Sequence, residues 1–280
     1  MNRVLFLVLL MPLLAGADDR FAKVEITAQH VAGSVHMLQG AGGNIGVSVG
    51  IDGTLIVDDQ YAPLADKIVA ALGDLGGDRP KLVLNTHYHG DHTGSNPTFG
   101  RTGTIVSHDN VRVRLVGQED FERSGLPVVT YADRINVHFN DEEIEVIHLP
   151  SGHTDGDSVV WFKTAGVIHQ GDHYFNGMFP YVDIDAGGNV DGFISNLESV
   201  VAMIPADTKI IPGHGPLSDL ARLQENIDVL KATSTLIREK LETGAEVSDI
   251  AADLDLDYEG WSWGFITSEL WVQTIQKNDS

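Results

Sequence analysis

A run of six residues, 87–92, dominates the sequence because it holds three histidines and one aspartate. His87 and His89 are two positions apart, directly after an apolar run that predicts a buried strand, so their imidazoles project to the same side. Asp91 and His92 fall in the turn or first helical turn that follows, where they can serve a second metal ion. Histidine nitrogens and aspartate oxygens suit zinc. The run therefore predicts a metal site at a strand end; a histidine-rich solvated loop is the alternative.

The composition indicates a chain that can bury a core beneath an acidic surface. Of the 280 residues, 42% are hydrophobic and 21% are charged, which suffices for one large domain or two small ones. The 18 lysines and arginines stand against 40 aspartates and glutamates, giving a formal net charge of -22. Such a charge disfavours binding to nucleic acid or to an anionic membrane. The absence of cysteine excludes disulfides, thiolate metal ligands and a lipidated cysteine anchor.

The N-terminus has the three-part layout of a secretory signal peptide. Arg3 precedes an apolar run over residues 4–14, and small residues up to Ala17 come before a polar segment. The apolar run is shorter than the ~20 residues that span a bilayer, which favours a cleaved signal over a membrane anchor. We expect residues 1–17 to be removed and residues 18–280 to form a periplasmic or secreted protein without stable membrane association.

The remaining sequence predicts two strand-rich halves with helices between and after them. No internal repeat or linker divides it, so we expect one catalytic domain over residues 18–280, with the aromatic C-terminus around Trp261, Trp263 and Trp271 capping the core. Residues 118–130 lack a period and predict a loop near the site entrance. Strand patterns occur over residues 24–28, 34–38, 45–49, 54–57, 81–86, 103–107, 134–139, 143–148, 158–162, 166–169 and 208–211. Helical patterns occur over residues 62–75, 109–116, 191–204, 220–241 and 247–254.

More side chains of metal-ligand type stand beside later strand patterns. His153 lies at the tip of a polar, glycine-rich loop, Asp172 follows the strand pattern 166–169, and His214 follows the strand pattern 208–211. A fold that gathers strand ends would bring them to the first cluster. The other histidines are expected to have roles apart from direct ligation: a core or surface role for His30, His36, His108 and His138, and a hydrogen-bonding role for His148, His169 and His173.

The pattern His-x-His-x-Asp-His, followed by two single histidines and a carboxylate, resembles the metallo-beta-lactamase superfamily over roughly residues 24–216. The resemblance implies an α/β (α+β) fold, an αββα sandwich of two mixed β-sheets with helices on both outer faces. It also implies a site for two zinc ions. The first would be held by His87, His89 and His153. The second would be held by Asp91, His92 and His214, with Asp172 bridging the ions or completing the second site.

The resemblance further implies a hydrolase that attacks an amide or ester carbonyl of a small molecule, a beta-lactam-like or lactone substrate, with water activated on zinc. Asp91 would be catalytic by handling the proton of that water. The residues expected to support the ligands are Asp58 and Thr86, with Thr154 a weaker candidate. Oligomeric state is left open by the sequence.

Two departures from true beta-lactamases bear on the substrate. Asp172 stands where the largest subclass has a zinc-binding cysteine, and Phe175 stands where that subclass has a lysine that pairs with the carboxylate of the drug. An aspartate at the first position is similar to glyoxalase II and the acyl-homoserine lactonases. Beta-lactamase activity is therefore expected to be weak or secondary.

Three alternatives accompany this interpretation. One is a thioester hydrolase of the glyoxalase II type, and another is a persulfide dioxygenase that uses a single iron. A non-catalytic metal-binding or partner-binding protein ranks last, because the ligand set is complete. Substrate choice is predicted to lie in the loops around Gly43, Gly125 and Phe175. The glycine-rich segment 39–44 is interpreted as a flexible turn, or as a short flap if it overhangs the site.

Overall fold

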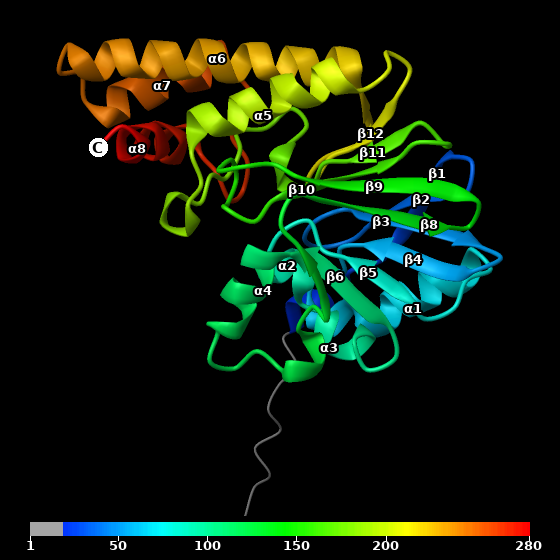
Figure 1. Ribbon diagram of the computed structural model, residues 1–280. Helices are drawn as coiled ribbons and strands as arrows, with labels where there is room; N and C mark the ends of the chain where they lie inside the picture. Colours follow the sequence, from blue (N-terminus) through cyan, green and yellow to red (C-terminus); the bar gives the residue numbers. More distant parts are fainter. Residues whose placement is uncertain (1–18) are drawn as a thin grey trace, which may run out of the picture.

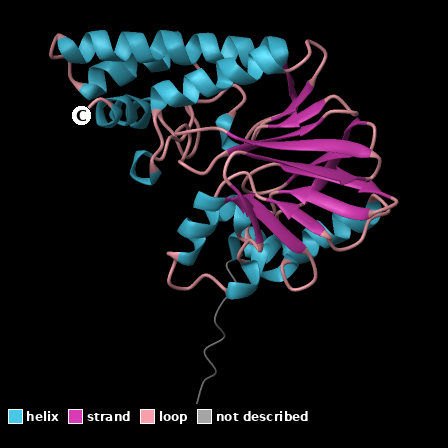
Figure 2. Cartoon of the chain, viewed as in Figure 1, coloured by secondary structure: helices cyan, strands magenta, loops and turns pink. Residues whose placement is uncertain are grey.

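Two β-sheets lie face to face in the computed structural model, which describes residues 19–280 (Figure 1). Helices cover the outer face of each sheet, so the layers follow the order helix, sheet, sheet, helix (Figure 2). The expected αββα sandwich is confirmed. The signal peptide predicted for residues 1–17 lies outside the described residues. Within residues 19–280, none of the helices combines the length and the hydropathy that a membrane span requires.

The first sheet begins as an antiparallel meander and ends as parallel strands. Strands β1 to β4 pair antiparallel, whereas β4 to β7 pair parallel. The crossover from β4 to β5 runs through α1, whose buried Ile68 and Leu72 belong to the apolar cluster on this face. In their order of pairing, the strands are β1 (Thr27–Ala32), β2 (Val35–Gln39), β3 (Ile45–Gly50), β4 (Gly53–Val57), β5 (Leu82–Leu84), β6 (Thr104–His108) and β7 (Val129–Tyr131).

The second sheet is antiparallel except for one parallel pair. Strands β11 and β12 are parallel, and α5 makes the crossover between them. The remaining neighbours pair antiparallel. In their order of pairing, the strands are β13 (Ser218–Asp219), β12 (Lys209–Ile211), β11 (Val167–His169), β10 (Ser158–Phe162), β9 (Glu142–His148) and β8 (Arg134–Phe139).

Helices α1 to α4 lie on the side of the first sheet and α5 to α8 on the side of the second (Figure 1). Side-chain caps fix the start of the long C-terminal helices, since Asn189 accepts from Gly192 N before α5 and Asp219 accepts from Arg222 N before α6. The helices are α1 (Ala65–Asp74), α2 (Gly90–Thr93), α3 (Asn96–Phe99), α4 (Asp109–Val116), α5 (Val190–Met203), α6 (Leu220–Glu242), α7 (Val247–Asp257) and α8 (Ser268–Asn278).

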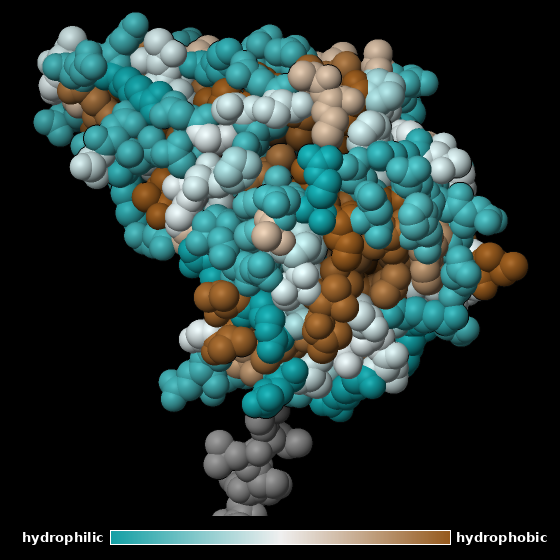
Figure 3. All heavy atoms as spheres, in the orientation of Figure 1, coloured by the Kyte–Doolittle hydropathy of each residue, from teal (hydrophilic) through white to brown (hydrophobic). Residues whose placement is uncertain are grey.

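Apolar side chains of both sheets fill the space between them. In β4, Leu55 and Val57 face the other sheet, whereas Ile56 packs towards α1. Successive residues of a strand face opposite sides, so a strand covered on both faces reads as a continuous apolar run. Figure 3 shows hydrophilic residues over the helices at the top and a band of hydrophobic residues over the sheet layers. Along β8, an edge strand, the partly buried Ile135 and Val137 pack against the core between the sheets.

Two segments differ from the sequence prediction. Residues 118–130, predicted as a loop near the site entrance, contain a 3-10 helix, Arg123–Gly125, and run into β7. This helix packs on α3, and a Cβ on Gly125 would lie 2.8 Å from Pro97 N. The strand predicted over residues 24–28 begins at Thr27. A three-residue strand such as β7 is set by its pairing with β6, which no local period reveals.

One turn of the second sheet is bonded to a turn of the first. Asn140, between β8 and β9, donates through Nδ2 to Ser48 Oγ (3.0 Å) and to Gly53 O (3.1 Å). Its Oδ1 accepts from Asp52 N at 2.9 Å. The backbone of Asn140 has a φ of 57°, a left-handed conformation that asparagine tolerates better than most residues. This side chain therefore joins the two sheets at the end of the sandwich.

We expect Asn140→Gly to lower the free energy of unfolding by about 2–3 kcal/mol, because it keeps the backbone conformation but removes three hydrogen bonds. Chemical denaturation followed by circular dichroism measures this change. Asp141→Gly is the matched control, since Asp141 is exposed and also has a positive φ of 59°. The control should not destabilise the protein. A loss for Asn140→Gly no larger than that of the control would contradict the prediction.

Candidate metal centre

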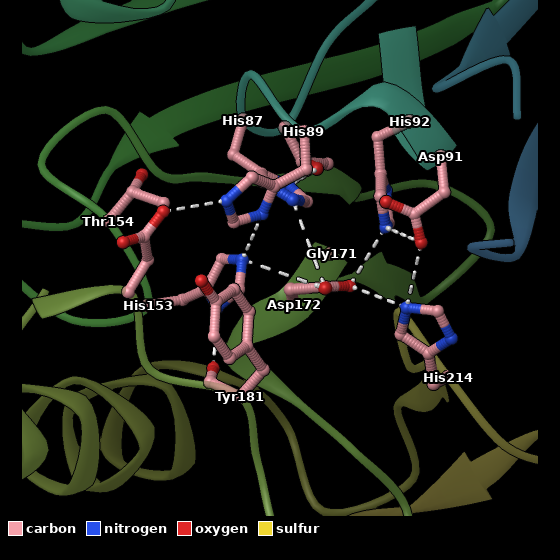
Figure 4. A network of polar contacts seen from close by, with 12 residues as sticks. His87, His89, Asp91, His92, His153, Thr154, Gly171, Asp172, Tyr181 and His214 are labelled. Carbon is pink, nitrogen blue, oxygen red and sulfur yellow. Dashed lines mark hydrogen bonds and ion pairs between the residues drawn. The ribbon is translucent and has the colours of Figure 1, made fainter. Parts of the chain in front are cut away.

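All seven predicted ligand side chains converge at one edge of the sandwich (Figure 4). The segment between β5 and the end of α2 supplies four of them, and loops of the second sheet supply the other three. The first four are His87, His89, Asp91 and His92. The other three are His153 between β9 and β10, Asp172 in a 3-10 helix after β11, and His214 after β12. The site thus joins both halves of the chain.

Three imidazoles and one carboxylate form the first candidate group. The ligand atoms of His87, His89, His153 and Asp172 all lie within 4.8 Å of one another. His89 Nδ1 faces His153 Nε2 at 2.9 Å. Asp172 Oδ2 lies 3.8 Å from His87 Nε2 and 3.6 Å from His153 Nε2.

The second group consists of Asp91, His92 and His214, whose ligand atoms also lie within 4.8 Å of one another. Asp91 Oδ2 is 3.7 Å from His92 Nε2 and 3.4 Å from His214 Nε2. The other oxygen of Asp172, Oδ1, lies 3.0 Å from His92 Nε2 and 3.4 Å from His214 Nε2. Asp172 therefore turns one oxygen to each group, as a bridging carboxylate would.

Unpartnered polar atoms show that the site fits cations. His87 Nε2, His92 Nε2 and Asp172 Oδ1 are buried and make no hydrogen bond. Buried polar atoms rarely stay without a partner, and these three face one another. A donor set of neutral imidazoles and carboxylates suits divalent ions such as zinc or iron.

Each imidazole of the run, and that of His153, forms a hydrogen bond through its outer nitrogen, the ring nitrogen that points away from the other ligands. His92 Nδ1 lies 2.7 Å from Asp58 Oδ2, and His87 Nδ1 lies 3.0 Å from Thr86 Oγ1. His153 Nδ1 is 2.6 Å from the carbonyl oxygen of Tyr181. Such bonds fix the tautomer and orientation of a ligand and leave its inner nitrogen free. Asp58 and Thr86 thus occupy the supporting positions expected from the sequence.

His89 is oriented by a residue that sequence reasoning missed. Its Nε2 lies 3.0 Å from Asp183 Oδ2, which also accepts from Tyr88 Oη at 2.7 Å. Burial alone would raise the pKa of Asp183, but the bonds from His89 and Tyr88 lower it to about 2. Asp183 comes almost a hundred residues after the run and belongs to no strand pattern, so no local signal in the sequence assigns it to the site.

Asp58 holds the run against β4. Thr86 donates to its carboxylate twice, from the backbone N at 2.8 Å and from Oγ1 at 2.7 Å. Asp58 has a φ of 64°, a strained conformation for a residue other than glycine. Strain of this kind concentrates at functional sites, where the surroundings hold it in place.

Thr154 supports a ligand indirectly. It donates from its N (2.7 Å) and Oγ1 (2.5 Å) to the carboxylate of Asp157. This pair folds the loop that carries His153. The other nearby histidines make hydrogen bonds, as expected: His148 with Asp157 O, His169 with Asn44 O and His173 with Asn196 Nδ2.

Charges inside the site are strongly coupled. Burial would raise the pKa of Asp172, yet His92 and His214 hold it well below its usual value. The same contact with Asp172 raises the pKa of His214 to about 9, although burial opposes this. Burial lowers the pKa of His153 to about 4. A carboxylate at the centre thus offsets positive charge on His214, while burial favours the neutral form of His153.

Comparison with known proteins identifies the family. The sequence profile of the metallo-beta-lactamase superfamily matches residues 49–214, more than half of the chain, and this span contains all seven converging side chains. The chain belongs to this superfamily. A solved metallo-beta-lactamase from Pontibacter korlensis shares the fold, with a TM-score of 0.65 and 16% identity over 74% of this chain and 99% of that chain.

Curated superfamily members of two kinds are similar in sequence. A type 2 metallo-beta-lactamase from Bacillus cereus is 23% identical over 180 residues, which are 64% of this chain and 69% of that protein. A hydroxyacylglutathione hydrolase from Methylococcus capsulatus is 29% identical over 64% of each chain. Another, from Nitrosococcus oceani, is 26% identical over 155 residues, so this chain spans about half of that protein, 55% of its length.

The glycine-rich segment of this superfamily member packs directly on the metal centre. Gly43 N donates to Asp91 O at 3.2 Å, and Asn44 N donates to Gly213 O at 2.7 Å. Asn44 Nδ2 also donates to the carbonyl oxygens of Pro212 and Gly215, both at 2.9 Å. Segment 39–44 is therefore a packed connection that ties the two halves of the site together, rather than a flexible turn.

A cavity of about 500 Å³ opens in front of the metal centre. Phe175 lines it as predicted, but it is only 1% exposed and stacks on His214 with ring centroids 5.1 Å apart. Of the other two loops predicted to determine substrate choice, the loop around Gly43 reaches the cavity through Gly42. Gly125 does not line the cavity. Trp263 and Phe265 of the C-terminal part also line it, although the sequence assigned this region to capping the core. Trp271 is fully buried against Phe179, and Trp261 and Trp263 are partly buried against the same core cluster, so all three also cap the core as expected.

The buried position of Phe175 determines the effect of a Phe175→Lys substitution. The lysine would replace the ring that supports His214 and would bury a charge. We expect the substitution to impair the metal centre rather than to improve the binding of a substrate carboxylate.

We expect Gly43→Ala to reduce the metal content of the purified protein without unfolding it. An added Cβ would lie 2.1 Å from His92 Cε1 and 2.5 Å from His92 Nε2, so the imidazole must move. Atomic emission spectrometry gives metal per chain, and circular dichroism reports the fold. Gly90→Ala is the control, because a Cβ there meets nothing within 4 Å. Equal metal content in both variants would show that His92 takes no part in binding.

Proposed function

We propose that this metallo-hydrolase of the metallo-beta-lactamase superfamily is an exported dinuclear zinc enzyme that hydrolyses an amide or ester carbonyl, with residues 18–280 as the catalytic domain. The observation that carries the proposal is the placement of Asp172, whose two oxygens face two separate groups of imidazoles. His87, His89 and His153 would hold one ion, and Asp91, His92 and His214 the other. Bound there, the ions would supply Lewis acidity and lower the pKa of a water molecule.

In such a reaction, Asp91 would transfer protons. It lines the cavity, and 20% of its side chain is exposed. Burial alone would raise the pKa of Asp91, but His92 and His214 lower it below the usual value, so it is a carboxylate at neutral pH. It can accept a proton from water in the cavity and return it to the leaving nitrogen or oxygen.

The substrate carbonyl would approach from the cavity between Asp91 and the aromatic side chains opposite. Tyr181 holds His153 through its backbone oxygen and also lines the cavity. Phe175 and Trp263 lie against His214, with centroid distances of 5.1 and 5.6 Å. These rings limit the access of bulk water to the metal centre, which strengthens charge interactions there.

Two other functions remain as candidates. A thioester hydrolase of the glyoxalase II type is supported by the similarity to hydroxyacylglutathione hydrolases. A persulfide dioxygenase with a single iron would use part of the same donor set. The lactam, lactone and thioester options are separated by assaying all three classes on zinc-loaded protein.

Metal analysis separates the hydrolase from the dioxygenase. We expect about two zinc ions per chain, because the two oxygens of Asp172 face two separate groups of imidazoles. Chelation should abolish hydrolysis, and zinc should restore it. The hydrolase proposal would be wrong if the protein contained about one iron per chain and no zinc, and consumed oxygen when a persulfide was added.

We expect Asp91→Asn to reduce kcat about a hundredfold or more while the protein stays folded, because the amide cannot accept a proton. Steady-state kinetics on the best substrate of the panel measures this loss. Asp66→Asn is the control, since the side chain of Asp66 is 95% exposed on α1. Near-normal turnover by Asp91→Asn would exclude both a metal-binding and a proton-transfer role for Asp91.

A further inference from the structure

Part of the aromatic wall of the cavity comes from outside the family region. Trp263 and Phe265 lie in the connection between α7 and α8, residues 258–267, whereas the superfamily profile ends at residue 214. Both side chains line the same cavity as Asp91 and His214. Helices α6 to α8, at the top of Figure 1, thus bring a distant segment to the metal centre.

The aromatic rings form a continuous surface from the metal centre to solvent. Trp263 lies 5.6 Å from His214 and 5.8 Å from Phe265, measured between ring centroids. Phe265 in turn lies 5.3 Å from Tyr181. Trp263 is fixed by bonds from Nε1 to Phe179 O and from N to Ile266 O, both 2.9 Å. The surface is therefore anchored at its inner end.

Phe265 is 58% exposed at the outer end of this surface. An exposed aromatic side chain that continues an apolar cavity wall is a feature of ligand-binding sites rather than of solvated surface. The cavity volume of about 500 Å³ also lies in the range of small-molecule sites.

Charge restricts what can bind to this surface. Among the described residues that line the cavity, none is a lysine or an arginine, whereas Asp91, Asp172 and Asp183 are acidic. Arg114 lies over the ring of Tyr88, but its guanidinium is occupied by two 2.7 Å bonds to Asp155. Arg20 lies over the ring of Tyr61 and does not line the cavity. A substrate carboxylate would meet no lysine or arginine in the described lining, where the positive groups would be His214 and the metal ions themselves.

We propose that Trp263, Phe265 and Tyr181 form the acyl-chain subsite of the enzyme, and that its substrates are uncharged esters with an apolar acyl chain. The inference rests on the proposed hydrolase function. In the reaction, water adds its oxygen to the acyl carbon, the bond from that carbon to the alcohol oxygen breaks, and the alcohol leaves with a proton. The chain of the acyl group lies along the aromatic surface during this step.

The test compares para-nitrophenyl octanoate with para-nitrophenyl acetate on the zinc-loaded enzyme. We expect kcat/KM to favour the octanoate by about tenfold or more, since the longer chain buries apolar area against the rings. Phe265→Ser and Trp263→Ala should each reduce this preference about tenfold. Leu256→Ser is the control, because Leu256 is 81% exposed on α7 and should leave the preference unchanged.

A charged substrate provides the second part of the test. The enzyme should hydrolyse penicillin G, which carries a carboxylate, much more slowly than the octanoate. Phe265→Arg should narrow this difference about tenfold by supplying the missing cation. Equal rates on both substrates for the unaltered enzyme, or a chain-length preference that survives both aromatic substitutions, would overturn the subsite.

A binding measurement separates this inference from the proposed function. Decan-2-one and butanone are uncharged ketones without a bond to hydrolyse, and calorimetry should detect only the longer one, with weaker binding to Phe265→Ser. If no ester, amide or lactone is hydrolysed but this pattern holds, the subsite stands and the hydrolase proposal fails. If esters are hydrolysed without chain-length preference and neither ketone binds, the subsite fails and the hydrolase proposal stands.

Discussion

The buried carboxylate of Asp172 is the constraint on which the site depends. It is 5% exposed and faces four imidazoles from three separate loops at 3.0 to 3.8 Å. A charge in such a place is costly unless positive partners surround it. The fold therefore requires cations there, either protonated histidines or metal ions. The outer hydrogen bonds of the imidazoles keep their inner nitrogens turned towards this point.

Close backbone packing gives the site its shape. Gly43 leaves room for His92, and a Cβ on Gly213 would lie 2.1 Å from Asp172 Oδ1. Because larger residues do not fit, the loops around the ligands approach as closely as the backbone allows. The superfamily region thus supplies the residues of the metal centre, while the connection between α7 and α8 supplies part of the cavity wall.

Local sequence was sufficient for the parts of the structure that are local. The run 87–92 follows a buried strand, and its spacing alone places its side chains together. Asp172 and His214 were recognised as strand-end residues of ligand type, but their convergence on the run was expected only from the family resemblance. Asp183 and Phe265 could not be found in this way, because they reach the site only through tertiary packing. Gly125 was misplaced for the same reason, since its helix packs on α3.

The division of the site between the two sheets has a thermodynamic consequence. The chain has no cysteine, so no disulfide can link its halves. A metal ion held by His87 from the first sheet and Asp172 from the second would act as a cross-link between them. Any ligand that binds only the folded state adds its binding free energy to stability. The free energy of unfolding of the sandwich would then depend on the concentration of metal ions around the protein.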